Sequence, residues 1–180
     1  MTILNTENSL ILIIDIQEKL LNVAFNKDIL KNRAEILAKT ANLLKIPCII
    51  TEQYPKGLGN TITQITENVS GYKFEKLSFN ALGNEEIFNC IKNLNKQQII
   101  LVGIETHICV RQTAEALIKV GYDVSVLKDC CGSRFESEHI AGLALMKQEG
   151  CFIKTTEITL FELLKSARHP NFKEIQSFIK

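Results

Sequence analysis

The sequence predicts an α/β fold in which helices cover both faces of a parallel sheet. Short, continuously apolar runs recur along the chain, and such runs are typical of strands that are buried on both faces. Longer segments with apolar residues at helical spacing lie between these runs. An alternation of this kind implies crossover connections between parallel strands, so we expect a doubly wound sheet.

The composition agrees with one globular domain over residues 1–180. The chain has 46% hydrophobic and 23% charged residues, which is enough apolar material for one full core and too little chain for two ordinary domains. Its formal net charge of +1 provides no basic field, so neither nucleic acid nor an anionic membrane is an expected partner.

The first half of the chain contains three expected strands and one long helix. Ser9 to Asp15 (SLILIID) is an apolar run that ends in a carboxylate, as a central parallel strand does. Helical spacing extends from Lys27 to Lys45, and Cys48 to Thr51 (CIIT) follows as the second strand. Tyr54 to Gly59 (YPKGLG) has the composition of a loop, and Gly71 to Lys76 is a short strand.

The second half repeats the alternation. We expect a helix at Glu85 to Leu94, a buried strand at Gln98 to Val102 and a helix at Thr106 to Val120. The remaining elements are an alternating strand at Tyr122 to Leu127, a helix at Glu136 to Glu149, a strand at Cys151 to Lys154, and a helical tail, Leu160 to Lys180, with a break at His169-Pro170. The apolar tail could pack on a partner subunit.

The segment from Leu101 to Val110 (LVGIETHICV) indicates where a site would lie. It reads as a strand, a glycine turn and the start of a helix with Cys109 in the first turn, where free N–H groups and the macrodipole favour a thiolate. Ligands bind beyond the carboxyl ends of the strands in such sheets, so Asp15 and Cys109 should open onto one edge. The alternative is that Cys109 is a small core residue between helix and sheet.

The cysteines and histidines give no sign of a metal site. The 6 cysteines include no CxxC pair, and no basic-then-apolar leader opens the chain, so we expect reduced thiols in a cytoplasmic protein. The 3 histidines show neither HxH nor HxxxH spacing. Cys130 and Cys131 are expected to be small residues under a loop.

Several motifs together resemble the isochorismatase-like cysteine hydrolases. They are Ile14 to Gln17 (IDIQ) after an apolar strand, a lysine before a phenylalanine near residue 76, Gly103 to Val110 (GIETHICV), and Asp129 to Arg134 (DCCGSR). Thr51 to Gly59 (TEQYPKGLG) and the tail sequence HPNFKE are most similar to the small isochorismatase domain-containing proteins. The resemblance implies a three-layer, Rossmann-like sandwich with about six parallel strands.

The resemblance also implies an active site with an Asp-Lys-Cys triad at Asp15, Lys76 and Cys109. In that scheme Cys109 attacks a small amide, carbamoyl or ester-like substrate and forms a thioester. Asp15 accepts the thiol proton and later protonates the leaving group, and Lys76 supplies a positive charge beside Asp15 and Cys109. The backbone N–H groups of Glu105 and Cys109 would form the oxyanion hole, and the Ile104–Glu105 peptide bond would be cis.

Each triad residue has a simpler alternative reading. An aspartate at a strand end is often the N-cap of the next helix, and Lys73 lies near enough to take the role of Lys76. We favour Lys76 because Phe79 follows at the family spacing, although Asn80 stands where the family commonly has serine. Arg134 is expected to pair with a nearby carboxylate and order its loop.

Substrate contacts are less well determined by sequence. Gln17, Tyr54 and Phe79 are candidates, and the two aromatic residues could equally be core. The Asp-x-His motif of metal-dependent nicotinamidases is replaced here by Glu52-Gln53-Tyr54, so we expect neither a metal nor another cofactor. Two other functions remain open. One is a catalytically silent member that binds a partner, and the other is enol-ether hydrolysis. Members of this family usually form homo-oligomers, so we expect one here. The sequence does not identify the substrate.

Overall fold

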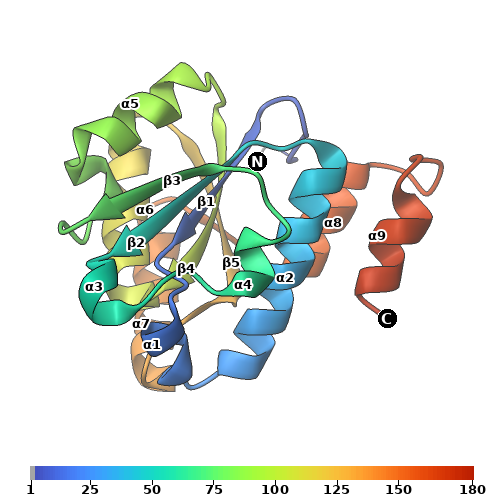
Figure 1. Cartoon of the computed structure of the whole chain (residues 1–180). Helices are drawn as coiled ribbons and strands as arrows, with labels where there is room; N and C mark the ends of the chain where they lie inside the picture. Colours follow the sequence, from blue (N-terminus) through green and yellow to red (C-terminus); the bar gives the residue numbers. More distant parts are fainter. Residues whose placement is uncertain (1–2) are drawn as a thin grey trace.

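The computed structural model describes residues 3–180 and contains a six-stranded sheet in which all neighbouring strands are parallel. The spatial order is β3-β2-β1-β4-β5-β6. This confirms the predicted doubly wound α/β sandwich (Figure 1). The strands are β1 (Ser9–Ile14), β2 (Cys48–Gln53), β3 (Tyr72–Lys76), β4 (Gln98–Ile104), β5 (Asp123–Gly132) and β6 (Phe152–Lys154).

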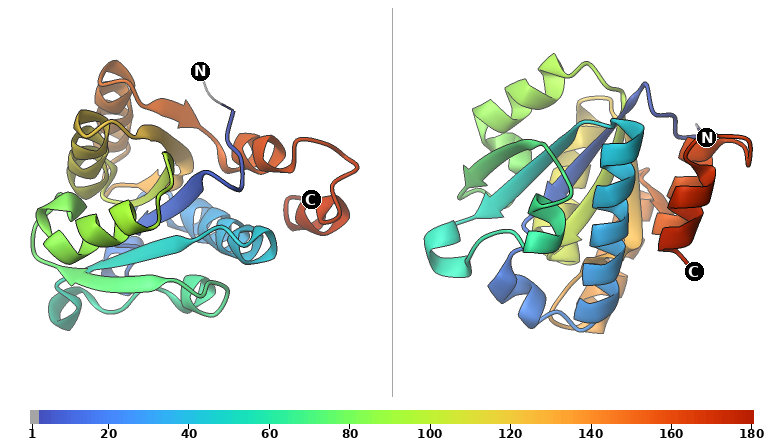
Figure 2. Two further views of the ribbon diagram at one scale, coloured as in Figure 1. Left: turned by 90° about the horizontal axis from the view of Figure 1, so that it is seen from above. Right: turned by 45° about the vertical axis from the view of Figure 1, so that its right-hand side comes forward.

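Two hydrophobic cores lie on the two faces of this sheet. Successive side chains of a strand point to opposite faces, so Leu10 and Leu12 of β1 join one core while Ile11 and Ile13 join the other. Burial of one such side chain contributes about 1.5–3 kcal/mol, so these continuous apolar runs stabilise both layers. The helices α2 (Lys27–Leu44) and α8 (Thr156–Leu164) cover one face, and α5 (Glu85–Asn93), α6 (Arg111–Lys119) and α7 (Glu136–Gln148) cover the other (Figure 2).

The C-terminal tail packs on its own chain. A third cluster joins Ile36 of α2 to Leu160 and Leu164 of α8 and to Ile175 of α9 (Phe172–Phe178). Figure 1 shows α9 as the outermost helix beyond α8. This contact covers one side of the tail, while Ile158 and Phe161 of α8 stay exposed on the other.

Short helical segments are where the sequence prediction was wrong. The expected loop at residues 54–59 contains α3 (Pro55–Leu58), and no helix was expected at α1 (Glu18–Asn22), α4 (Thr63–Thr66) or the 3₁₀ turn η1 (Ala81–Gly83). Helices of one turn are too short to display a 3.6-residue period. β5 also runs on to Gly132, so Cys130 and Cys131 lie in a buried strand and not under a loop. All six cysteines are free.

Gly103 has a different role from the predicted turn. It lies inside β4 with φ of +143°, and a Cβ atom there would be 2.1 Å from the backbone oxygen of Ile14. Glycine therefore permits a close approach of β4 to β1, next to Asp15. The chain leaves the sheet only after Ile104, through a π-helical segment, η2 (Thr106–Val110), that continues into α6.

Candidate active site

The three predicted site residues lie at the carboxyl edge of the sheet on three different elements. Asp15 follows β1, Lys76 is the last residue of β3, and Cys109 lies in η2. Asp15 has φ of +51°, a sparsely populated conformation for a residue with a side chain. The strand order places β2 between β1 and β3, so the Asp15 and Lys76 side chains contact each other across the carboxyl end of β2.

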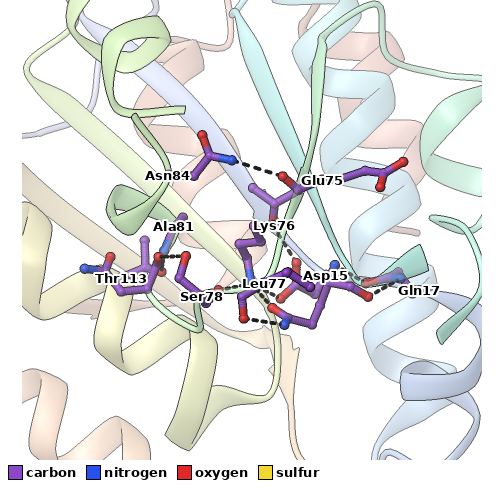
Figure 3. Close-up of polar contacts among 12 residues, drawn as sticks. Asp15, Gln17, Glu75, Lys76, Leu77, Ser78, Ala81, Asn84 and Thr113 are labelled. Carbon is purple, nitrogen blue, oxygen red and sulfur yellow. Dashed lines mark hydrogen bonds and ion pairs between the residues drawn. The ribbon is translucent and has the colours of Figure 1, made fainter. Parts of the chain in front are cut away.

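Asp15 and Lys76 form a fully buried ion pair. Lys76 Nζ lies 2.6 Å from Asp15 Oδ2, and both side chains are 0% exposed (Figure 3). The same ammonium donates to Gln53 Oε1 at 2.7 Å and to the backbone oxygen of Ser78 at 3.3 Å. The three N–H donors of Lys76 thus have three acceptors, which offsets much of the desolvation cost of a buried cation.

The structure also distinguishes Lys76 from Lys73. Lys73 is 47% exposed, and its ammonium lies 3.0 Å from Glu52 Oε1. Glu52 is buried, and it also accepts hydrogen bonds from the Thr61 amide and hydroxyl. Lys73 therefore helps to fasten the Thr61 segment to β2, and Lys76 is the lysine beside Asp15.

The Asp15 carboxylate is held from a second direction by Thr51 on β2. Thr51 Oγ1 donates to Asp15 Oδ1 at 2.7 Å, and the Asp15 amide donates to the Thr51 backbone oxygen at 3.1 Å. Asp15 is not a helix cap, because α1 begins after Gln17 and has no side-chain cap. Its carboxylate is thus oriented by Thr51 and Lys76 toward the cysteine.

Cys109 is 6% exposed and lies beside this ion pair. The Asp15 carboxylate and the Glu105 backbone N–H are both close enough to its thiol to act on its pKa. Burial and the Asp15 charge raise the pKa of Cys109 to about 12, and the opposing effect of Lys76 is smaller. The prediction that Cys109 is a thiolate before substrate binds is therefore wrong. The thiol keeps its proton at neutral pH, and a base must remove that proton during the reaction.

We expect the alkylation of Cys109 to follow this raised pKa. Iodoacetamide reacts with thiolates, and the thiolate fraction rises about tenfold per pH unit below the pKa. Peptide mapping by mass spectrometry should show little labelling of Cys109 at about pH 6 and a steep rise toward about pH 9. The half-buried Cys90 is the internal reference. If Cys109 is labelled well before Cys90 at the lower pH, its thiolate is already present and the raised pKa is wrong.

The segment before the cysteine is fixed by polar contacts on both sides. The Ile104–Glu105 peptide bond is cis. The Glu105 carboxylate accepts from Arg134 Nε at 2.8 Å, which confirms the expected pairing of Arg134. Thr106 Oγ1 lies 2.8 Å from Nδ1 of the buried His139. These contacts fix the backbone at Glu105 and Thr106, which precedes Cys109.

The candidate substrate contacts have different positions. Gln17 is buried, and its amide group bonds to the Gln53 backbone and to the Gly59 oxygen, so it fixes the wall of the site and does not face a ligand. Tyr54 is 54% exposed and lines a cleft of about 510 Å³ with Lys76 and Ser78. Phe79 is 53% exposed. Neither aromatic residue is core.

Sequence reasoning missed two residues of this site, Thr51 and Gln53. Their signal was the polar sequence Thr51-Glu52-Gln53 at the end of an otherwise apolar buried strand. Asn80, where the family commonly has serine, caps η1 by accepting from the Leu82 amide at 2.9 Å. That contact accounts for Asn80 as a turn residue.

Two features are absent from residues 3–180. No group of three His, Cys, Asp or Glu side chains in that range is arranged to hold a metal ion. No helix within the same residues has both the length and the apolar character to cross a membrane.

Known proteins resemble this chain over nearly its whole length. The family model described as "Isochorismatase domain" matches residues 9–158. "Isochorismatase family protein 1A" of Dictyostelium discoideum is 39% identical over 178 residues, which cover 96% of this chain and 86% of that protein. The structure of MAR1 ribonuclease from Caenorhabditis elegans has a TM-score of 0.92 and 34% identity, covering 98% of this chain and 91% of that one. YcaC from Pseudomonas aeruginosa, with hexane-2,5-diol and covalent acrylamide, has a TM-score of 0.92 and 26% identity, covering 97% and 90%.

Proposed function

The chain belongs to the isochorismatase-like hydrolase family, and from that premise we propose that it is a cysteine hydrolase of small neutral amides, carbamoyl amides or esters. Asp15, Lys76 and Cys109 are the proposed catalytic residues. One observation carries the proposal: a buried carboxylate that is bonded to a lysine ammonium and lies beside a cysteine thiol. Such a constellation is costly to bury and is typical of functional sites.

In the proposed first half-reaction, the Cys109 sulfur attacks the substrate carbonyl carbon while the thiol proton passes to Asp15. The carbonyl oxygen becomes an oxyanion, and the backbone N–H groups of Glu105 and Cys109 stabilise it. When this intermediate collapses, the bond from carbon to the leaving nitrogen or oxygen breaks. Asp15 returns its proton to that leaving atom, and a thioester remains on Cys109.

The second half-reaction uses the same groups in reverse. Asp15 takes a proton from water as the water oxygen attacks the thioester carbon. The second tetrahedral intermediate collapses with cleavage of the carbon–sulfur bond, the acid product leaves, and the proton returns to the sulfur. Lys76 transfers no proton in this scheme, because its charge serves to hold Asp15 ionised beside a thiol that must lose its proton.

The contacts of the buried Lys76 ammonium favour a neutral substrate. All three N–H donors of Lys76 already bond to Asp15, Gln53 and Ser78, so this cation has none left for a substrate carboxylate. Arg134 is paired with Glu105. A dicarboxylate of the isochorismate type would lack Lys76 as a partner, so enol-ether hydrolysis is the weaker alternative.

Other functions have less support. A silent binding protein would not need the buried Asp15–Lys76 pair beside Cys109. A relative named as a ribonuclease raises RNA as a substrate, but the net charge of +1 does not favour a polyanion. We propose a small molecule as the substrate. We also propose that residues 1–180 form one domain, which needs no cofactor, lies in the cytoplasm and assembles into a homo-oligomer.

The test of this function is a panel of small amides, carbamoyl amides and esters, with a short single-stranded RNA included. Each compound is incubated with the wild type and with Cys109→Ala, and products are identified by mass spectrometry. Turnover of an amide or ester that requires Cys109 supports the proposal. Turnover of RNA alone, or equal turnover by both proteins, contradicts it.

We also expect the activity to be independent of divalent metals. The proposed route needs no Lewis acid, because Cys109 is the nucleophile and backbone N–H groups stabilise the oxyanion. Hydrolysis should survive extensive dialysis against EDTA and should be lost after alkylation of the thiols at alkaline pH. Loss of activity on chelation, with recovery on adding one specific metal, would overturn the metal-free mechanism and favour nicotinamidase-type chemistry.

A further inference from the structure

Two polar side chains of β2, which take no part in the proposed chemical steps, each bond to a different charged residue of the site. Thr51 Oγ1 donates to Asp15 Oδ1 at 2.7 Å, and Gln53 Oε1 accepts from Lys76 Nζ at 2.7 Å. Thr51 and Gln53 are two positions apart on one strand, so their side chains share a face. β2 lies between the strands that carry Asp15 and Lys76, and it contacts both residues of the ion pair.

Thr51 is suited to hold Asp15 in its ionised form. Its hydroxyl is buried and donates to one carboxylate oxygen, while Lys76 occupies the other. A hydroxyl that donates to a carboxylate favours the charged form over the protonated one. The backbone bond from the Asp15 amide to the Thr51 oxygen fixes the distance between the two residues.

Gln53 is suited to hold Lys76 in its protonated form. Its Oε1 can only accept and lies on the Lys76 ammonium, while its Nε2 donates to the Leu77 backbone oxygen at 2.8 Å. The backbone of Gln53 is in turn bonded on both sides to the Gln17 amide group. Gln53 is therefore a fixed acceptor for the ammonium, and because it is neutral it adds no second negative charge beside Cys109.

We propose that Thr51 and Gln53 are positioning residues that keep Asp15 ionised and Lys76 protonated while Cys109 awaits substrate. This inference rests on the proposed hydrolase function. Two other carboxylates close to this edge are paired elsewhere, since Glu52 bonds to Lys73 on the other face of β2 and Glu105 bonds to Arg134. Glu75 lies along the cleft that Lys76 also lines. Cys109 is the further titratable group that contacts Asp15.

The experiment measures kcat/KM for p-nitrophenyl acetate, a small neutral ester, across the pH range. Cys109→Ala supplies the background rate. In Thr51→Val the carboxylate loses a donor that favours its charged form, so it becomes protonated at higher pH. We expect the acidic limb of the profile to move up by about one pH unit and the rate at neutral pH to fall about tenfold. Thr51→Ser keeps the hydroxyl and should restore both.

Gln53→Met should change the other limb of the pH profile of kcat/KM. The Lys76 ammonium loses one acceptor in a buried site, so its neutral form is favoured and the alkaline limb should move down by about one pH unit. The matched control is Thr40→Val on α2, a buried threonine whose hydroxyl has no partner within residues 3–180. Thr40→Val should leave both limbs in place. Circular dichroism and denaturant unfolding verify that each variant is folded.

The outcomes separate this inference from the proposed function. If Asp15→Asn loses ester turnover while Thr51→Val and Gln53→Met lower the rate with both limbs in place, the two residues are merely structural and the inference is overturned. If Asp15→Asn turns over the ester as fast as the wild type, the proposed mechanism fails as well. Should Thr51→Val not fold, the alkaline limb of Gln53→Met decides the inference by itself.

Discussion

Replacement of Cys109 by alanine should reduce hydrolysis by about 10⁴-fold or more, with the protein still folded. The reason is that the sulfur is the only atom that forms the thioester, so no other group can replace it in the proposed route. Deletion of one small, buried sulfur leaves a minor cavity and should cost only about 1 kcal/mol of stability. The measurement is kcat/KM on the best compound of the substrate panel, together with denaturant unfolding of both proteins.

Cys90→Ala provides the matched control for this prediction. Cys90 is a half-buried thiol on α5, and its loss should leave kcat/KM within about twofold of the wild type. In the wild type, an acid quench during turnover should trap an acyl group on the peptide that contains Cys109. Hydrolysis that persists in Cys109→Ala, or an acyl group found on another cysteine, would rule out Cys109 as the nucleophile.

Lys76→Met should be both strongly destabilising and inactive. It leaves the buried Asp15 carboxylate without its cation, and removal of one partner of a buried ion pair costs about 3–5 kcal/mol. The free energy of unfolding, measured with urea, should show this loss near neutral pH.

Two further variants test whether the charge itself is responsible. Lys73→Met removes a half-exposed lysine from Glu52, which keeps its bonds to Thr61, so it should cost about 1 kcal/mol or less. The double variant Asp15→Asn with Lys76→Met removes both charges and should recover much of the stability, but no activity. A larger loss from Lys73→Met than from Lys76→Met would contradict the assignment of the two lysines.

The fold class followed from the sequence because its signals are local. The apolar runs of β1 and β4 are continuous since both faces of these strands are covered, and the spacing of α2 repeats over 18 residues. The one-turn helices α3 and α4 were not predicted, because a single turn shows no period. Gly103 was assigned to a turn, since nothing near it in sequence shows that Ile14 lies against it.

The sequence by itself determined the parallel sheet and, through the family motifs, the positions of Asp15, Lys76 and Cys109 at its carboxyl edge. Only the tertiary structure decided between Lys73 and Lys76, because the partner of Lys76 is 61 positions away in the chain. It also decided the protonation of Cys109, since burial and the Asp15 charge outweigh the effect of Lys76 on its pKa. Backbone patterns depend on neighbours in sequence, whereas charge pairing and desolvation depend on what folding brings into contact.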